Sequence, residues 1–471
     1  ELMRMEPSLL NADSPFVALH HEVVDWVEAR RQSTVFDDSH LQVMFDQCKE
    51  LIIGLQKRGA VVGSSLNTAY LLERLSQTLE RLETLMAIFV SNRYLPRRIL
   101  LLTGCFARAA AERHSISRLW KQSSGLIARS VTQNAGDHGE HYITRDKKEY
   151  WAMFYSAAGG GVLIALMALF KIYLGSIIDD KVWKGVAEGL NYGLGFMVIF
   201  MLHFTVATKQ PAMTAARFAE AVEKTPQGKS VNMKLAQLLV DVFRSQSIAV
   251  LGNVLIAMGL AALIAFGYQY KTGEPLMNAD QIAYQLHSID PFAGTLWFAA
   301  IAGVWLFCSG IISGYFDNRS NYLNMRMRLT QHPLLKKLMS EKTRVKFANY
   351  MHENYGSLIG NLCFGMLLGI TGVVGYLTHL PLDIRHVAFS SANVGYIAVS
   401  GEFTYSLLLQ CIGFVLLIGL VNLIVSFSLT LWVALRSLNA EVDSWWPIWH
   451  EVCQIVKKRP LSLFLPVQLD K

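Results

Sequence analysis

The chain has 471 residues, of which 52% are hydrophobic and only 17% charged, and its mean hydropathy is +0.30. Soluble domains carry roughly a quarter charged residues, and disordered chains combine low hydrophobicity with high charge, so neither class fits the chain as a whole. The net charge of +7 suits either a nucleic-acid-binding surface or the basic cytoplasmic loops of a membrane protein, and the positions of the charges decide between the two.

Residues 1–150 are predicted to form a cytoplasmic helical domain. The clearest helix covers 67–90, where apolar side chains recur at the 3.6-residue period of an amphipathic helix. Similar patterns occur over 40–57 and 97–118. The stripe predicts the core of a helical bundle, and docking of a protein partner is the alternative use of this domain. The stripe consists of Leu71, Leu75, Leu79, Leu82 and either Leu85 or Met86.

Six apolar stretches follow, each long enough for a transmembrane helix, which needs about 20 residues. They cover 152–174, 190–207, 248–268, 295–316, 358–377 and 406–435. The sequence therefore predicts an all-α polytopic membrane protein with about six transmembrane helices over 151–436. A C-terminal tail over 437–471 is expected in the cytoplasm.

Lysine and arginine concentrate in alternate connections between these stretches. Two long basic segments, 208–247 and 317–356, join the second span to the third and the fourth to the fifth. Because basic loops stay in the cytoplasm, both termini are predicted to lie there. Topology then accounts for the net charge, so membrane lipids are expected as partners and nucleic acid is not. The other connections carry only Lys181, Lys184, Lys271 and Arg385.

The second-to-third and fourth-to-fifth span pairs share several identities in one register. They indicate either a duplicated two-span unit, of the kind that places a transporter site between repeats, or chance matches between glycine-rich helices. The clearest pairs are Gly252 and Asn253 with Gly360 and Asn361, and Gly267 and Tyr268 with Gly375 and Tyr376.

His203 lies inside the second predicted span, with Thr205, Thr208 and Lys209 close behind it. An ionisable residue inside a span costs about a few kcal/mol, which makes this group a candidate binding site. The alternative is a neutral histidine that bonds to a neighbouring helix. The amides expected to bond between helices are Asn253, Asn361, Gln410 and Asn422.

The segment 380–393, between the fifth and sixth predicted spans, mixes apolar residues with Asp383, Arg385, His386 and Asn393. An ordinary external loop would be more polar, so this one is predicted to be partly buried or re-entrant against protein or a water-filled cavity. We expect Asp383 and Arg385 to pair, and His386 to bind a ligand or sense pH. A structural plug is the alternative.

No cofactor or metal is expected. Residues 138–141 (HGEH) lack the helical His-Glu-x-x-His spacing of zinc sites. The sequence contains no P-loop, GxSxG or dinucleotide-binding fingerprint, which disfavours ATPase, esterase and dehydrogenase activities.

Four stretches carry a resemblance to a known family: 191–195 (NYGLG), 203–214 (HFTVATKQPAMT), 310–318 (GIISGYFDN) and 382–393 (LDIRHVAFSSAN). Through them the chain resembles the proteobacterial family named site-specific recombinase, of the gonococcal recombinase-related type. The resemblance covers most of the chain and is strongest over about 150–435. It implies a polytopic protein of the bacterial inner membrane.

The family name implies DNA recombination, which the residues do not favour. A tyrosine recombinase needs a His-x-x-Arg pair because the arginine holds the scissile phosphate, and none of the 13 histidines has an arginine three positions later. Six spans also leave no sheet-containing domain of the serine-recombinase kind. The leading hypothesis is a transporter, channel or lipid-handling protein with a site among the transmembrane helices; an oligomer is possible, and enzymatic activity is not favoured, although an intramembrane enzyme is a minor alternative. The alternatives are a membrane scaffold and, third, the recombinase.

Overall fold

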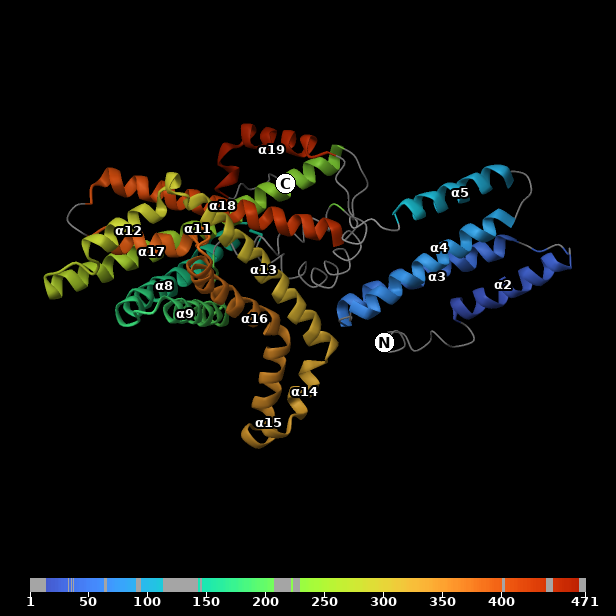
Figure 1. The fold of residues 1–471 in the computed structure, drawn as a ribbon, viewed down its shortest axis with the longest axis horizontal. Helices are drawn as coiled ribbons and strands as arrows, with labels where there is room; N and C mark the ends of the chain where they lie inside the picture. The colour runs from blue at the N-terminus through green and yellow to red at the C-terminus, as the bar shows by residue number, and fades with distance from the viewer. Residues whose placement is uncertain are drawn as a thin grey trace. The chain divides into compact units, whose positions relative to one another are not determined.

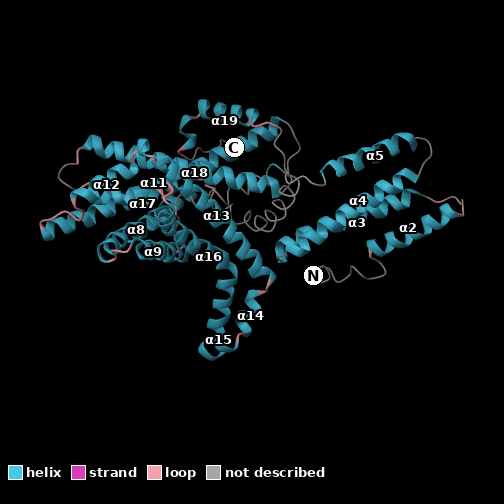
Figure 2. Ribbon diagram, viewed as in Figure 1, coloured by secondary structure: helices cyan, strands magenta, loops and turns pink. Residues whose placement is uncertain are grey.

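The computed structural model describes residues 14–32, 34, 36, 38–62, 66–89, 95–112, 143–144, 146–206, 222, 229–399, 403–437 and 444–465. Every regular element in this part of the chain is a helix, and no strand occurs there (Figure 2). The all-α prediction is confirmed for the described residues. The chain forms two compact units, one of Glu1–Gln133 with Asn318–His352 and one of Asn134–Asp317 with Glu353–Lys471.

The N-terminal part of the first unit is a bundle of helices in which neighbours along the chain pack together (Figure 1). The ammonium group of Lys49 on the second helix lies 2.8 Å from the carboxylate of Glu83 on the third. The bundle consists of α2 (Pro15–Arg31), α3 (Asp38–Val62), α4 (Leu66–Phe89) and α5 (Leu95–Glu112). Its core is formed by Leu19, Trp26, Leu41, Phe45, Cys48, Ile52, Leu79 and Met86.

The predicted leucine stripe matches α4 apart from its first member. Leu79 and Met86 are buried, and Leu75 and Leu82 pack against the same core. Leu71 is 41% exposed, and Leu72 is buried in its place. At the start of α4 the buried position is therefore Leu72, which packs with Leu55 of α3. It lies one residue after Leu71, the position that the spacing predicts.

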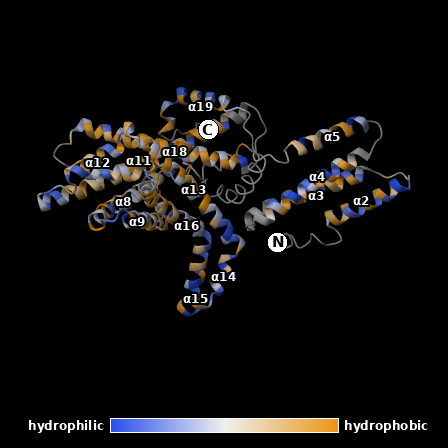
Figure 3. Ribbon diagram, in the orientation of Figure 1, coloured by the Kyte–Doolittle hydropathy of each residue, from blue (hydrophilic) through white to orange (hydrophobic). Residues whose placement is uncertain are grey.

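Residues 318–352 of the first unit include the two short helices α14 (Met325–Gln331) and α15 (Pro333–Leu338). Both mix basic with apolar residues, and Figure 3 shows hydrophilic and hydrophobic colours side by side over this part of the chain. Pro333 occupies the first turn of α15, where its missing N–H costs no helical hydrogen bond.

Five described helices are long and apolar enough to cross a membrane, and Figure 3 shows their apolar residues. They are Lys147–Ile177 (α8), Met233–Thr272 within α11 (Lys229–Thr272), Thr295–Tyr322 (α13), Glu341–Thr378 (α16) and Tyr405–Arg436 within α18 (Tyr405–Ser437). The remaining elements of the second unit are α9 (Lys181–Met201), α12 (Ala279–Ile289), η4 (Pro291–Ala293), α17 (Val387–Ile397), α19 (Trp446–Lys458) and η5 (Pro460–Leu463).

The second predicted span is misplaced. The sequence predicts 190–207, but α9 covers Lys181–Met201, and His203 adopts the left-handed conformation at φ 58° just beyond it. Ser156 on α8 supports this helix end, because its hydroxyl donates to the carbonyl of His203 at 3.0 Å and its carbonyl accepts from the N–H of Thr205 at 3.1 Å. The residues after Met201 form a turn and then an irregular segment up to Val206. With 21 residues, α9 has the length of a bilayer core of roughly 30 Å, but it is not among the five described helices that are also apolar enough to cross a membrane.

Two fully buried asparagines bond to backbone where helices break. On α11, the amide nitrogen of Asn253 donates to the carbonyl of Ala157 on α8 and to that of Thr205 at 2.9 Å. On α18, the amide nitrogen of Asn422 donates to Ala299 on α13 at 2.7 Å and to Arg385 at 3.0 Å. Each amide thus joins a long helix to a non-helical segment, as expected for interhelical bonds.

Close helix contacts depend on glycine. A Cβ atom at Gly369 of α16 would collide with the backbone of Gly189 on α9, and one at Gly365 would collide with Gly193. On α8, a Cβ atom at Gly161 would meet the backbone of α11. Small residues spaced four apart let helices approach closely in membranes, and the structure uses this device at both crossings.

The segment predicted to be buried contains a short helix at the centre of the second unit. α17 packs against α8, α11, α12 and α18, and nearly all of its side chains are buried. The hydroxyl of Tyr396 donates to the carbonyl of Ala165 on α8 at 2.8 Å. With 11 residues, α17 reaches only about half of a bilayer core.

The N–H of Val387 donates to the side-chain oxygen of Asn422 at 3.1 Å. Replacing Asn422 by leucine is expected to lower the free energy of unfolding by about 2–4 kcal/mol, because this N–H and the carbonyl of Arg385 lose their buried partner. Thermal unfolding in detergent measures the change. Gln410→Leu is the matched control on the same helix: the sequence predicts an interhelical amide there, but the structure exposes it. Equal effects of the two variants would contradict the assigned role.

Candidate functional site

A cavity of about 490 Å³ opens between α8, α9, α12 and the segment that leads into α17. This volume lies within the range of about 300–1,000 Å³ typical of small-molecule sites. All of its walls belong to the second unit, at the end where α8 finishes and α9 begins. The lining residues include Lys171, Lys184, Glu188, Tyr192, Asp280, Tyr284, Ser288, Asp383, Arg385, His386, Ser390 and Asn393.

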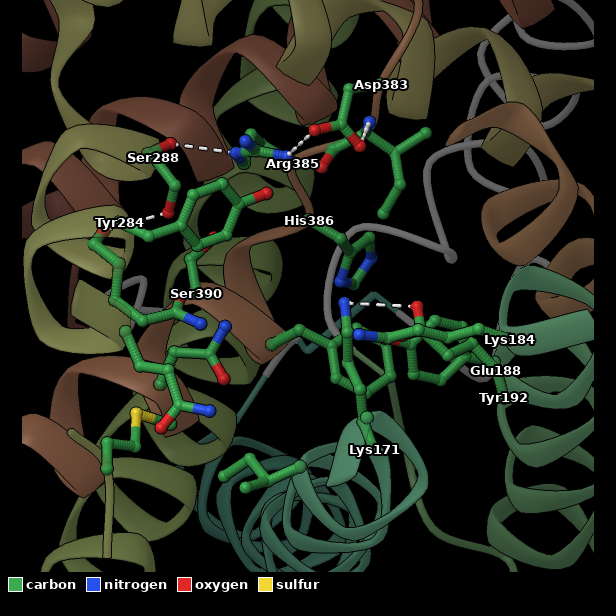
Figure 4. A pocket seen from close by; sticks show the side chains of 18 of the residues that line it. Lys171, Lys184, Glu188, Tyr192, Tyr284, Ser288, Asp383, Arg385, His386 and Ser390 are labelled. Atoms are coloured by element: carbon green, nitrogen blue, oxygen red, sulfur yellow. Dashed lines mark hydrogen bonds and ion pairs between the residues drawn. The ribbon is translucent and has the colours of Figure 1, made fainter. Parts of the chain in front are cut away.

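Figure 4 shows the arrangement of these side chains around the cavity. Lys184, Glu188 and Tyr192 of α9 lie on one side, and Tyr284 and Ser288 of α12 lie on the other. Three basic and three acidic side chains line the cavity in total. A ligand therefore meets both signs of charge within one small site.

The predicted pair of Asp383 and Arg385 forms one edge of the cavity. A guanidinium nitrogen of Arg385 lies 2.6 Å from the Asp383 carboxylate. The Arg385 Nε–H donates to the carbonyl of Ser288 on α12 at 2.8 Å, and its guanidinium lies 5.4 Å from the ring centre of Phe298 on α13. One arginine thus holds the non-helical segment against two helices.

Lys171 and Glu188 form a second ion pair on the opposite wall. The ammonium group of Lys171 on α8 lies 3.3 Å from the Glu188 carboxylate on α9 and 5.7 Å from the ring centre of Tyr192. Lys171 falls inside the first predicted span. Its charge in an apolar stretch is the signal that sequence reasoning should have used, since ionisable residues within spans mark functional sites.

His386 lies at the base of the cavity and is 1% exposed. It precedes α17 as the N-cap residue, outside the five long apolar helices. The rings of Phe196, Phe364 and Phe389 surround its imidazole, with centres 6.4, 5.7 and 6.1 Å away. Burial lowers the pKa of His386 to about 4, because the charged form would lose its hydration. The side chain is therefore neutral at neutral pH.

The α12 wall is held rigidly by its own N-terminus. Asn278 and Gln281 form a reciprocal capping box, in which each side chain bonds to the other's backbone N–H. Asp280 follows in the first turn of the helix, where a carboxylate interacts favourably with the helix dipole. The capping box thus stabilises the N-terminal turn of the helix that carries Tyr284 and Ser288.

The structure brings together four of the predicted site residues and separates the others. Asp383, Arg385, His386 and Asn393 all line the cavity. His203 is exposed, and Thr205 is buried beside Ser156, its hydroxyl 2.9 Å from the serine hydroxyl; neither lines the cavity. Thr208 and Lys209 lie outside the described residues.

No group of three metal-ligating side chains comes together within the described part of the chain. The HGEH segment at 138–141 lies outside that part.

Comparison with known proteins identifies the family. The family model described as "Site-specific recombinase" matches residues 1–466, so the chain belongs to this family. Neither a curated protein nor a solved structure matches the chain. The class that the fold defines is a helical membrane protein.

Acid is expected to destabilise the protein through His386. Its pKa in the folded state lies below the ordinary value of 6.5, so the unfolded chain takes up the proton first as the pH falls, and stability is lost from about pH 6.5 toward about pH 4. Between about pH 7.5 and about pH 5 this group alone costs about 2 kcal/mol.

His386→Phe is expected to remove that part of the pH dependence, measured as the difference in thermal unfolding at the two pH values. The control His203→Gln alters an exposed histidine and should retain it. An unchanged pH dependence in His386→Phe would contradict the assignment.

Proposed function

We propose that this protein is a transporter, channel or lipid-handling protein that binds a small charged solute or a lipid headgroup in the cavity between α8, α9, α12 and α17. The observation that carries the proposal is the cavity itself: charged side chains lie among long apolar helices, where each costs about a few kcal/mol unless function retains it. The Lys171–Glu188 pair on one wall and the Asp383–Arg385 pair on the opposite one present both signs of charge to the cavity.

The short helix α17 supports the same proposal. Non-helical backbone at membrane depth is tolerated where it is buried in protein or lines a cavity, and transporters place their sites at helices that are broken in this way. Arg385 and His386 belong to such a break. On the charge bias of the connections, the cavity opens toward the outer face of a bacterial inner membrane, with both chain ends in the cytoplasm.

The two ion pairs suggest which groups contact the ligand. Lys171 and Arg385 are each engaged by a carboxylate. Lys184 also lines the cavity. Its ammonium group lies next to Gly175 of α8, which is another of the lining residues. In this proposal Lys184 binds the anionic part of the ligand, while the two ion pairs shape the site.

Lys184→Gln is expected to reduce transport at least tenfold, because it removes the cation from the binding cavity. Proteoliposomes loaded with a total extract of small cellular solutes would be assayed by mass spectrometry for solute efflux, with transfer of a fluorescent phospholipid between leaflets as the second readout. The matched control is Lys181→Gln, one turn away on α9, whose ammonium group lies 4.4 Å from the ring centre of Tyr376 and which does not line the cavity.

The proposal fails if wild-type vesicles release no solute and move no lipid faster than empty vesicles. Equal losses in both variants would also contradict the role of Lys184.

A second candidate function, partner docking, rests on α5. This helix exposes several large apolar side chains, Ile99, Leu100, Leu101 and Phe106, where an isolated domain would bury them. A photo-crosslinking residue at position 101 is expected to give one discrete protein adduct in cells, and the same residue at the exposed polar position 108 is not. Absence of an adduct at position 101 would remove this candidate.

Recombination of DNA, which the family description names, has no support in the fold of the described residues. They contain no sheet, and the sequence lacks the His-x-x-Arg pair. Purified protein that cleaves duplex DNA at low salt would overturn this view.

A further inference from the structure

The amphipathic helix α19 is fixed to the second unit by its inner face. Ile448 is buried in one apolar cluster with Leu235 and Ala236 of α11 and with Leu431 and Ala434 of α18, and α19 packs against α11. Beyond the helix, the ring of Phe464 lies 6.2 Å from that of Phe243 on α11. The helix therefore has a defined orientation, with one face against protein and the other turned away from it.

The outer face of α19 carries the side chains that proteins place at the surface of a membrane. Trp446 is 78% exposed and Trp449 is 56% exposed, and Cys453, one turn further, is exposed as well. The helix then ends in Lys457, Lys458 and Arg459. Tryptophan is enriched at membrane interfaces, and lysine and arginine are attracted to anionic lipid.

The depth of α19 follows from the apolar cluster that it shares with the end of α18. Leu431 and Ala434, which belong to the same buried cluster as Ile448, lie in the last turns of an apolar helix long enough to cross the bilayer. In the same turns, Trp432 is 50% exposed and the Arg436 guanidinium lies 4.9 Å from its ring centre. An exposed tryptophan under an arginine is typical of the headgroup region.

We propose that α19 lies in the headgroup layer at the C-terminal end of α18, where its outer face binds anionic phospholipids. Trp446 and Trp449 insert between headgroups, and the cationic end of the helix pairs with their phosphates. Charge complementarity favours anionic lipid over a protein partner, because α19 and its C-cap contain three basic residues and only one acidic residue, Glu451. The proposal does not depend on the ligand of the cavity.

Cys453 makes the depth of the outer face measurable in the full chain. The variant Cys105→Ser removes the other exposed cysteine among the described residues, and a nitroxide on Cys453 then reports its collisions with oxygen and with a water-soluble nickel chelate. In nanodiscs of phosphatidylcholine with about one third phosphatidylglycerol, the oxygen-to-nickel ratio is expected to be several-fold higher at Cys453 than at a reference label. The reference is Glu341→Cys, an exposed position at the start of α16, with Cys105 and Cys453 replaced by serine.

The anionic lipid is tested by removing the charges. Each basic residue near a charged surface is worth about fivefold in affinity. Lys457→Gln, Lys458→Gln and Arg459→Gln together are therefore expected to abolish the rise in the ratio on going from pure phosphatidylcholine to the anionic mixture. The matched control neutralises Lys336, Lys337 and Lys342, which are exposed elsewhere, and should behave as the wild type does.

The double variant Trp446→Ala and Trp449→Ala is expected to bring the ratio at Cys453 down to the reference value, with thermal unfolding unchanged within a few degrees. A label on wild-type Cys453 that nickel reaches as freely as position 341 would overturn the proposal. So would a ratio that is high but insensitive to both phosphatidylglycerol and the charge-neutralising variant, since that pattern shows that the label is shielded from nickel without any contribution from anionic lipid.

Discussion

The second unit depends on one constraint: backbone polar groups that leave a helix inside an apolar environment must find a partner within the protein. Two buried amides meet this need. Asn253 bonds to the carbonyl of Thr205, just after α9 ends, and Asn422 bonds to the carbonyl of Arg385 and the N–H of Val387, just before α17 begins. Without these bonds the two helix breaks would leave unsatisfied groups in the core.

The two amides are built alike. Each lies on a long helix that follows a break, and each also donates to the carbonyl of a long helix that precedes it, Ala157 for Asn253 and Ala299 for Asn422. The predicted duplication pairs Asn253 with Asn361 instead, and Asn361 bonds to Ser357 within its own helix. That duplication stays a prediction. The bonding pattern that does recur in the structure is the one made by Asn253 on α11 and by Asn422 on α18.

The cavity is a consequence of the second break. Because the chain leaves α16 at Thr378 and resumes as α17 only at Val387, the intervening segment carries Asp383 and Arg385 into the space between α9 and α12. Arg385 holds the segment to Ser288, and Lys171 with Glu188 closes the opposite wall. The family description speaks of recombination, whereas the fold is that of a helical membrane protein with a cavity lined by charged side chains.

Composition and local patterns were enough to predict the class of protein and many of its helices. Hydropathy located the long helices because burial in lipid requires about 20 apolar residues in a row, and the mixed composition of 380–393 marked the buried segment with Asp383, Arg385 and His386. The amphipathic period of 67–90 likewise predicted α4. These features are local, and composition records them directly.

Where the helices end, and which residues come into contact, depends on packing between segments that lie far apart in the sequence. Hydropathy could not show that α9 stops at Met201, because the stop depends on Ser156 of another helix. It could not separate His203 from the cavity or bring Lys171 and Glu188 into it, since these residues lie far from Asp383 along the chain. Local sequence records what each segment prefers, whereas the site is made of contacts between segments, and only their packing sets those distances.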